Sequence, residues 1–194
     1  QEFRHLSQTS TCQTSWSPDS KVLAYGNSPD SENSGIFLAT LQTGADTRLT
    51  TAPSGSVDGD PAFSPKGDQL AFLRSTSATS RDLFITSIPD HRERRLTFLN
   101  ARLESPQWTA DGKRIIFCLN PTQFIGERSL FSIDVTGGKP KRLPFISSDA
   151  ATPAISLSGN ELGYVAASLD ANVWKVSLNT TSNANRRFEQ PAQP

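Results

Sequence analysis

The chain contains few side chains of the kinds that perform nucleophilic catalysis. Its two histidines, His5 and His91, lie far apart in the sequence, and its two cysteines are Cys12 and Cys118. Acyl transfer needs a nucleophile held beside a base, and no Gly-x-Ser-x-Gly elbow occurs. Two histidines and two scattered cysteines also lack the spacing of a zinc site. We therefore expect no enzyme activity, no catalytic residues, no cofactor and no metal.

Two acidic stretches carry the oxygen ligands that calcium prefers. They are Asp30–Asn33 and Asp58–Asp60. Neither follows the ligand pattern of an EF-hand loop, and Asp, Asn and Ser are also the residues that loop geometry favours. We therefore interpret both stretches as loops.

The chain of 194 residues is electrically balanced, with 19 basic and 19 acidic side chains and a formal charge of zero. A nucleic-acid binder usually shows a clustered basic surface, so this segment is not expected to bind nucleic acid. No apolar run approaches the roughly 20 residues that span a bilayer, so we expect no membrane insertion. The chain begins with Gln1 and contains no methionine, which favours an excised part of a longer protein.

One apolar pattern occurs four times, at intervals of 47, 45 and 47 residues. It begins at Trp16, Phe63, Trp108 and Ile155, and nine residues later come Tyr25, Phe72, Phe117 and Tyr164. A fixed period in this range indicates a repeat architecture, in which each unit buries its apolar face against its neighbours.

The second copy shows most clearly what one unit contains. It reads as an apolar strand start at 61–64, a turn at 64–67, and strands at 69–73, 83–88 and 94–97. Proline and glycine in the turn preset its backbone, and charge on the short last strand protects an outer sheet edge. No long segment has an apolar period of about 3.6 residues, so helix should be scarce. Four short antiparallel strands per unit predict an all-β fold, a β-propeller of about four blades whose aromatic residues fill the spaces between blades.

The repeat divides the chain into blades. We expect an outer strand of a preceding or closing blade at 1–13, blades at 14–59, 60–104, 105–151 and 152–188, and a tail at 189–194. The segments Phe3–Ser7 and Arg186–Phe188 both resemble outer strands, which gives five candidates for four inner sets. Three arrangements stay open: part of a larger ring, half of a two-chain ring completed by a homodimer, and a four-bladed monomer. Neighbour-only packing keeps Cys12 and Cys118 apart, so we expect two free thiols.

The repeat residues carry a family resemblance. The second copy reads Pro61-x-Phe63-Ser64-Pro65-x-Gly67-x-x-Leu70-Ala71-Phe72, and the first keeps Trp16-Ser17-Pro18-Asp19. This pattern resembles the Pro-Asp type of WD40-like repeat found in the propeller of TolB and in related bacterial propellers. The resemblance covers roughly residues 14–180, although the fourth copy has lost the Pro-Asp pair and the opening aromatic residue.

The resemblance implies a non-enzymatic module of a larger bacterial protein. Such a module binds a protein or peptide partner, in the periplasm or another extracytoplasmic setting. Similar repeats also form the non-catalytic propellers of prolyl-oligopeptidase-like serine peptidases, which is the alternative reading. They occur, too, in bacterial winged-helix regulators and kinases, where a cytoplasmic location would apply.

Recognition on such a scaffold is expected in the loops, because loops vary while the strands stay regular. The loops before each first strand and after each second strand emerge on one face of a propeller. We nominate six partner-binding residues there: Asp58, Asp60, Arg102, Glu104, Asp149 and, in the longest loop, Phe124.

Overall fold

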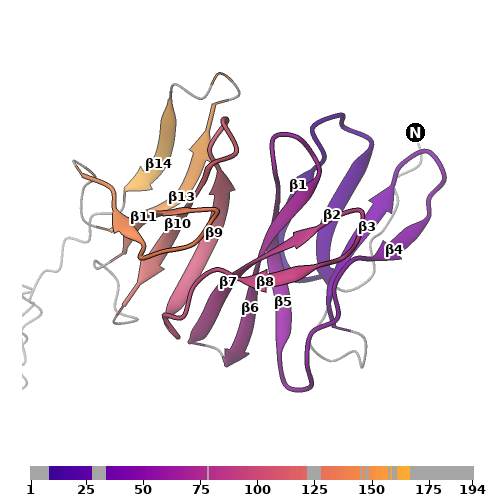
Figure 1. Cartoon of the computed structure of the whole chain (residues 1–194), viewed down its shortest axis with the longest axis horizontal. Helices are drawn as coiled ribbons and strands as arrows, with labels where there is room; N and C mark the ends of the chain where they lie inside the picture. Colours follow the sequence, from indigo (N-terminus) through magenta and orange to yellow (C-terminus); the bar gives the residue numbers. More distant parts are fainter. Residues whose placement is uncertain are drawn as a thin grey trace, which may run out of the picture.

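The computed structural model describes residues 9–27, 34–77, 79–121, 128–144, 146, 149–156, 158 and 161–166. All regular elements in these ranges are β-strands, which confirms the all-β prediction. The strands form three four-stranded antiparallel sheets and one sheet with two described strands (Figure 1). Over the same ranges, the fold offers no apolar helix of membrane-spanning length.

Each blade uses consecutive strands of the chain. Blade 1 contains β1 (Thr9–Trp16), β2 (Val22–Asn27), β3 (Ile36–Thr40) and β4 (Asp46–Arg48). Blade 2 contains β5 (Val57–Phe63), β6 (Gln69–Ser77), β7 (Ser80–Ser87) and β8 (Glu93–Arg95). Blade 3 contains β9 (Arg102–Trp108), β10 (Arg114–Asn120), β11 (Ser129–Asp134) and β12 (Lys141–Arg142). Blade 4 shows β13 (Ala150–Ile155) and β14 (Leu162–Ala166), while its expected outer strand at 186–188 and the N-terminal one at 3–7 lie outside the described residues.

The turn between the first two strands of a blade is built by one hydroxyl. In blade 1 the Ser17 hydroxyl donates to Asp19 at 2.6 Å and accepts the backbone N–H of Val22 at 2.9 Å. Thr109 makes the same pair of contacts in blade 3, with Asp111 at 2.6 Å and the N–H of Arg114 at 3.1 Å. These bonds satisfy backbone groups where the ladder ends, so the predicted turn residues have a direct structural role.

The first strand of a blade begins earlier than the apolar pattern predicted. Phe63 ends β5, and the strand extends back to Val57 through Asp58 and Asp60. Its pairing register with β6 shifts between Gly59 and Ala62, which marks a β-bulge. The polar residues around the bulge resemble a loop in the sequence, which is why the predicted strand start at residue 61 is wrong.

The bulge recurs at one position of the repeat. Asp60, Ser105 and Thr152 each precede a proline and have positive φ angles of 50°, 54° and 46°. Each lies three residues before the apolar residue that ends the first strand. A bulge re-aims a side chain, so this position is set to project polar groups out of the regular ladder.

Three apolar clusters lie between successive blades. Phe72 and Leu70 of blade 2 pack with Ala24, Ile36 and Leu49 of blade 1. The joint between blades 2 and 3 contains Leu73, Leu83, Leu103, Trp108, Ile115 and Phe117, and the joint between blades 3 and 4 contains Ile116, Cys118, Leu130, Ala150 and Ala151. The prediction that aromatic residues fill these spaces is confirmed for Phe72, Trp108 and Phe117.

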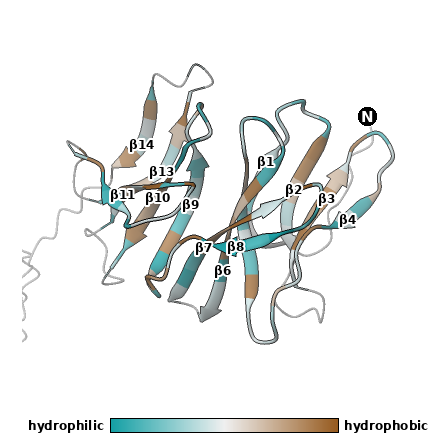
Figure 2. Cartoon of the chain, viewed as in Figure 1, coloured by the Kyte–Doolittle hydropathy of each residue, from teal (hydrophilic) through white to brown (hydrophobic). Residues whose placement is uncertain are grey.

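Hydropathy follows the radial position of a strand. Figure 2 shows the outer strands β4 and β8 as hydrophilic and much of β2 and β10 as hydrophobic. All three side chains of β8 are exposed, whereas five of the seven residues of β10 are buried. Charged outer edges and apolar inner strands are the arrangement that a blade needs in order to pack on two sides and stay unpaired at its rim.

Candidate binding site between the first strands

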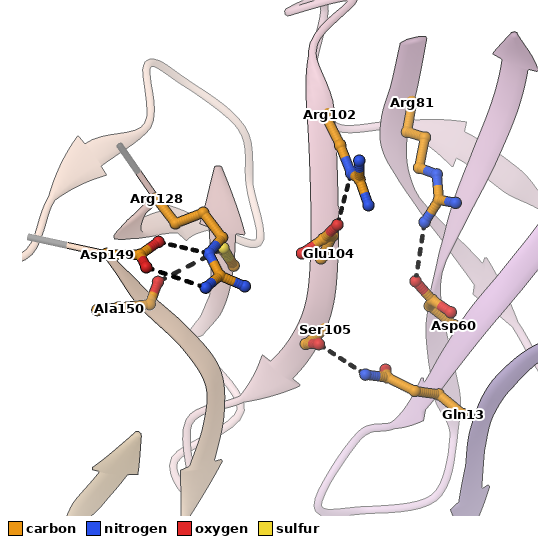
Figure 3. Close-up of polar contacts among 10 residues, drawn as sticks. Gln13, Asp60, Arg81, Arg102, Glu104, Ser105, Arg128, Asp149 and Ala150 are labelled. Carbon is orange, nitrogen blue, oxygen red and sulfur yellow. Dashed lines mark hydrogen bonds and ion pairs between the residues drawn. The ribbon is translucent and has the colours of Figure 1, made fainter. Parts of the chain in front are cut away.

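Eight polar side chains from all four blades gather around the first strands (Figure 3). We call this group the central cluster: Gln13, Asp60, Arg81, Arg102, Glu104, Ser105, Arg128 and Asp149. Four of its members, Asp60, Arg102, Glu104 and Asp149, were nominated from the sequence. Whether they bind a partner stays a prediction, but the fold does bring them together.

Asp60 and Arg81 form the ion pair of blade 2. The Asp60 carboxylate lies 3.3 Å from a terminal nitrogen of Arg81. Burial raises the pKa of Asp60 above its ordinary 3.8, opposed by the charge of Arg81 and reinforced by that of Glu104. The buried Nε of Arg81 has no hydrogen-bond partner. Arg81 therefore keeps one donor that the pair with Asp60 does not use.

Arg102 and Glu104 form the most exposed pair of the central cluster. Arg102 Nε donates to Glu104 Oε1 at 2.6 Å, and both residues are on β9. In Figure 3 this pair lies between the Asp60–Arg81 and Arg128–Asp149 pairs. Arg102 is therefore the arginine of the central cluster that is most exposed to solvent.

Arg128 and Asp149 join blade 3 to blade 4. Two nitrogens of Arg128 donate to the two oxygens of Asp149, at 2.6 and 3.2 Å. The hydrogen bond to Asp149 raises the pKa of Arg128. Asp149 is buried and has a positive φ angle of 59°, so its backbone and its side chain are both fixed.

Gln13 and Ser105 connect blades that are not neighbours in the chain. Gln13 Nε2 donates to Ser105 Oγ at 2.6 Å, which joins β1 to β9 across 92 sequence positions. Gln13, like Ser105, lies three residues before the apolar end of its first strand. The repeated bulge position thus brings side chains of different blades into contact at the centre of the array.

Two nominated residues are not in the central cluster. Asp58 is 0% exposed and accepts hydrogen bonds from Arg74 at 2.6 and 2.7 Å and from the Thr50 hydroxyl at 2.7 Å. Its carboxylate is therefore committed to internal contacts between blades 1 and 2. Phe124 lies outside the described residues, as does the acidic stretch Asp30–Asn33.

Comparison with known proteins agrees with this geometry. The sequence profile of the TolB beta propeller domain matches residues 3–188. The chain belongs to the TolB β-propeller family. The resemblance seen in the repeat is therefore confirmed.

Individual relatives of this TolB-type propeller are longer than the chain. TolB from Acinetobacter baumannii is similar with a TM-score of 0.68 and 25% sequence identity, over 82% of this chain and 38% of that one. A prolyl endopeptidase is similar with a TM-score of 0.55 and 19% identity, over 78% of this chain and 24% of that one. The uncharacterized peptidase YuxL of Bacillus subtilis is 30% identical over 106 residues, which are 52% of this chain and 16% of YuxL. The chain thus spans well under two thirds of these relatives.

Sequence reasoning missed four members of the central cluster in this TolB-type propeller. They are Gln13, Arg81, Ser105 and Arg128. The bulge position gives a signal for Gln13 and Ser105, because both occur three residues before the end of a repeated first strand. Arg81 and Arg128 also share a repeat position, three residues before Phe84 and Phe131. Their partners do not, because Asp60 lies three residues before Phe63 and Asp149 six before Ile155, so only the packed structure identifies the two pairs.

The described part of the propeller was also searched for metal-binding groups and reactive thiols. No group of three or more His, Cys, Asp or Glu side chains is arranged there to hold a metal ion. The carboxylates of Asp58 and Asp60 both pair with arginines instead. Cys118 is a buried free thiol, as expected, and burial raises its pKa to about 12. A thiol in that state is a poor nucleophile.

Proposed function

We propose that this chain is a non-catalytic interaction module that binds a protein or peptide partner at the central cluster. The observation that carries the proposal is the gathering of three arginine–carboxylate pairs from blades 2, 3 and 4 in one place (Figure 3). A guanidinium presents several N–H donors and a carboxylate accepts them. Such pairs can exchange internal partners for the amide groups and charged side chains of a polypeptide.

The charge balance of the cluster supports a polypeptide over a polyanion. Its three arginines, Arg81, Arg102 and Arg128, face three acids, Asp60, Glu104 and Asp149. A phosphate backbone is bound by surfaces with excess basic charge, and this cluster has none. Donors and acceptors in equal number suit a chain that carries both signs of charge and a regular series of N–H and C=O groups.

Family membership supports the setting of the proposed function. A TolB-type propeller in a larger bacterial protein favours a periplasmic or otherwise extracytoplasmic location. Fusion to a regulator or kinase would instead favour the cytoplasm. Fusion of this chain to alkaline phosphatase, which is active only outside the cytoplasm, distinguishes the two when the chain is expressed with its natural flanking segments.

The binding proposal is tested with peptides from a random library displayed on phage. Peptides recovered on the purified chain are synthesised, and Kd is measured for the wild type and for Arg102→Ala. We expect Arg102→Ala to weaken binding by about tenfold or more, because a hydrogen bond to a charged group contributes roughly 1.5–3 kcal/mol. Arg102 is the exposed arginine of the cluster, so the fold should tolerate the change.

The matched control is Arg92→Ala. Arg92 is also exposed and ion-paired, with Asp90, but it follows the end of β7 that is remote from Arg81. We expect this variant to bind the peptides like the wild type. The same affinity in both variants, or the same loss in both, would contradict binding at the central cluster.

A second function is favoured by the similarity to YuxL and to a prolyl endopeptidase. In that alternative the chain is the non-catalytic propeller of a serine peptidase or another hydrolase. An α/β-hydrolase domain with a Gly-x-Ser-x-Gly elbow, encoded next to this chain, would support it. Hydrolysis of a prolyl p-nitroanilide by the purified chain alone would contradict both proposals, because each assigns the chain no catalytic role.

A further inference from the structure

A cavity of about 280 Å³ lies between blades 1 and 2. Four apolar side chains form much of its wall: Val22 and Leu38 from blade 1, and Phe63 and Ile88 from blade 2. All four are only partly buried, so part of their apolar surface stays uncovered. Small-molecule sites are mostly apolar and usually measure about 300–1,000 Å³, so this cavity suits a ligand of about amino-acid size.

The joint between blades 2 and 3 shows why the cavity is present. Trp108 holds the repeat position of Phe63, is 7% exposed and donates its indole N–H to the backbone oxygen of Ala62 at 2.9 Å. A flat aromatic ring therefore fits between two adjacent blades at this place. Because phenylalanine is smaller than tryptophan, Phe63 fills the equivalent space between blades 1 and 2 only in part.

The wall that blade 1 contributes is the most apolar of its kind in blades 1 to 3. The residues at the two equivalent positions are Val22 and Leu38 in blade 1, Gln69 and Ile85 in blade 2, and Arg114 and Ser132 in blade 3. Only the first pair is free of polar groups. The joint between blades 1 and 2 is thus the one in which an uncharged ring would replace water at least cost.

Two exposed side chains of opposite charge border the cavity. They are Asp19, in the first turn of blade 1, and Lys66, in the first turn of blade 2. Asp19 accepts the Ser17 hydroxyl at 2.6 Å and the backbone N–H of Lys21 at 3.2 Å. These bonds, that of Ser17 first, lower the pKa of Asp19, so its carboxylate is ionised at neutral pH. The Lys21 ammonium lies 3.8 Å away in an exposed pair, which contributes little.

The two charges belong to turns that touch. A Cβ on Gly67 would lie 3.2 Å from Cδ of Pro18, and Gly67 has a φ angle of 73°. The turn of blade 2 approaches that of blade 1 this closely because residue 67 has no side chain. Asp19 follows Pro18 and Lys66 precedes Gly67 in the sequence, so the acid and the base lie at one mouth of the cavity.

We propose that this cavity binds a free aromatic α-amino acid. The ring lies against the apolar wall, the α-ammonium group lies at Asp19 and the α-carboxylate lies at Lys66. In such a ligand an apolar group and both charges are separated by only a few bonds, which matches an apolar wall bordered by one acid and one base. The flat ring of Trp108 in the next joint favours an aromatic side chain over a branched aliphatic one. No residue of the central cluster lines the cavity, so this inference is independent of the proposed function.

The test measures ligand binding by NMR, with saturation transferred from the purified chain to L-phenylalanine. We expect a Kd on the order of 1 mM, as is usual for so small a ligand in a half-open site. 3-Phenylpropionate lacks the ammonium group and phenethylamine lacks the carboxylate. Each should bind about two- to fivefold more weakly, the factor that corresponds to one exposed ion pair. L-Leucine, which has no ring, should also bind more weakly.

Two variants locate the site. Phe63→Trp should weaken binding of L-phenylalanine by about tenfold or more, because it places in this joint the ring that already fills the next one. Asp19→Asn should weaken L-phenylalanine about two- to fivefold and leave 3-phenylpropionate unchanged, because the latter has no ammonium group to lose its partner. Circular dichroism and thermal unfolding check that both variants fold.

The matched control is Asp111→Asn. Asp111 holds the repeat position of Asp19 and accepts the same two turn bonds, from the Thr109 hydroxyl and the backbone N–H of Lys113, but it does not line the cavity. This variant should bind L-phenylalanine like the wild type. Equal losses in Asp19→Asn and Asp111→Asn would overturn the proposal, because they would assign the effect to the turn and not to the ligand.

Three further results would overturn the proposal. The first is an absence of saturation transfer at about 10 mM L-phenylalanine, well above the expected Kd. The second is a folded Phe63→Trp variant that binds like the wild type. The third is equal binding of L-leucine, or of N-acetyl-L-phenylalaninamide, which lacks both charges. Equal binding of that amide would assign the cavity to an aromatic residue within a polypeptide instead.

Discussion

Gln13 donates a hydrogen bond to Ser105 at 2.6 Å and so joins the first strand of blade 1 to that of blade 3. The two residues occupy the same position of the repeat in different units. Contacts in a repeat array usually involve nearest neighbours. This bond therefore reports the curvature that brings the first strands together around one centre.

We predict that Gln13→Ala lowers the free energy of unfolding by about 0.5–1.5 kcal/mol, the usual net value of a neutral hydrogen bond. Urea unfolding of Gln13→Ala, Ser105→Ala and the double variant gives the coupling energy. A coupling of similar size assigns the loss to this bond. Additive effects of the two changes would show that the bond contributes nothing.

Asp58 should be important for stability, because it neutralises an arginine inside the molecule. Asp58→Ala leaves the guanidinium of Arg74 largely buried beside Phe84, at 4.8 Å from the ring centre, without its main carboxylate. We expect a loss of about 3–5 kcal/mol, as for other broken buried ion pairs. The control Asp90→Ala removes an exposed pair with Arg92 and should change stability by under about 1 kcal/mol in urea unfolding. Equal effects would refute a special role of burial.

Asp60 should make the fold less stable as the pH rises. Because burial raises its pKa in the folded state, the folded chain binds more protons than the unfolded chain above pH 3.8. Its contribution to stability is thus fully present below that pH and declines as the pH rises through the folded-state pKa. Asp60→Asn should remove this decline, so wild type should lose stability relative to the variant from about pH 4 to neutrality. Urea unfolding at several pH values measures the difference, and parallel curves would contradict the assignment.

Trp108 should stabilise the joint between blades 2 and 3 through both its size and its N–H group. Trp108→Phe leaves the backbone oxygen of Ala62 without this donor and opens a space in the apolar cluster. We expect a loss of about 1–3 kcal/mol in thermal or urea unfolding. Phe98→Ala, at an exposed aromatic residue, serves as the comparison and should stay within about 0.5 kcal/mol. A larger loss of stability for Phe98→Ala than for Trp108→Phe would contradict the stabilising role of Trp108 between blades 2 and 3.

Cys118 should resist thiol reagents in the folded protein. Its thiol is fully buried, and its pKa of about 12 leaves almost no thiolate at pH 8. In a Cys12→Ser background, Ellman's reagent should react with Cys118 only after urea unfolding. Complete reaction within seconds under native conditions would show that the joint between blades 3 and 4 is open.

Residue type and spacing were enough to predict the blades. The aromatic pairs Tyr25–Phe37 and Phe72–Phe84 stack across the second and third strands, at 5.8 and 5.6 Å between ring centres. Their positions repeat in the sequence because each blade must fill the same space. The start of each first strand was missed, since the bulge at Asp60 puts polar residues where an apolar pattern is expected.

Spacing alone does not show which blade supplies the carboxylate that binds the repeat-position threonine of each blade, Thr50 or Thr97. Thr97 bonds the backbone N–H of Leu83 and the carboxylate of Asp82, on the same blade. Thr50 is the equivalent threonine in blade 1, but Gly35 stands where Asp82 would be, and a Cβ there would lie 2.1 Å from the Thr50 backbone oxygen. The acid is supplied by Asp58 of the next blade instead.

The sequence by itself determined the all-β repeat and the membership of a TolB-like propeller. Local spacing carries that information, because every blade packs residues of the same type at the same positions. Only the tertiary structure decided that Asp58 faces inward while Asp60 joins Arg81, and that Trp16 is exposed while Trp108 is buried. Those outcomes depend on which residues of the next blade face each side chain, and a repeat that is locally alike in every copy does not show this.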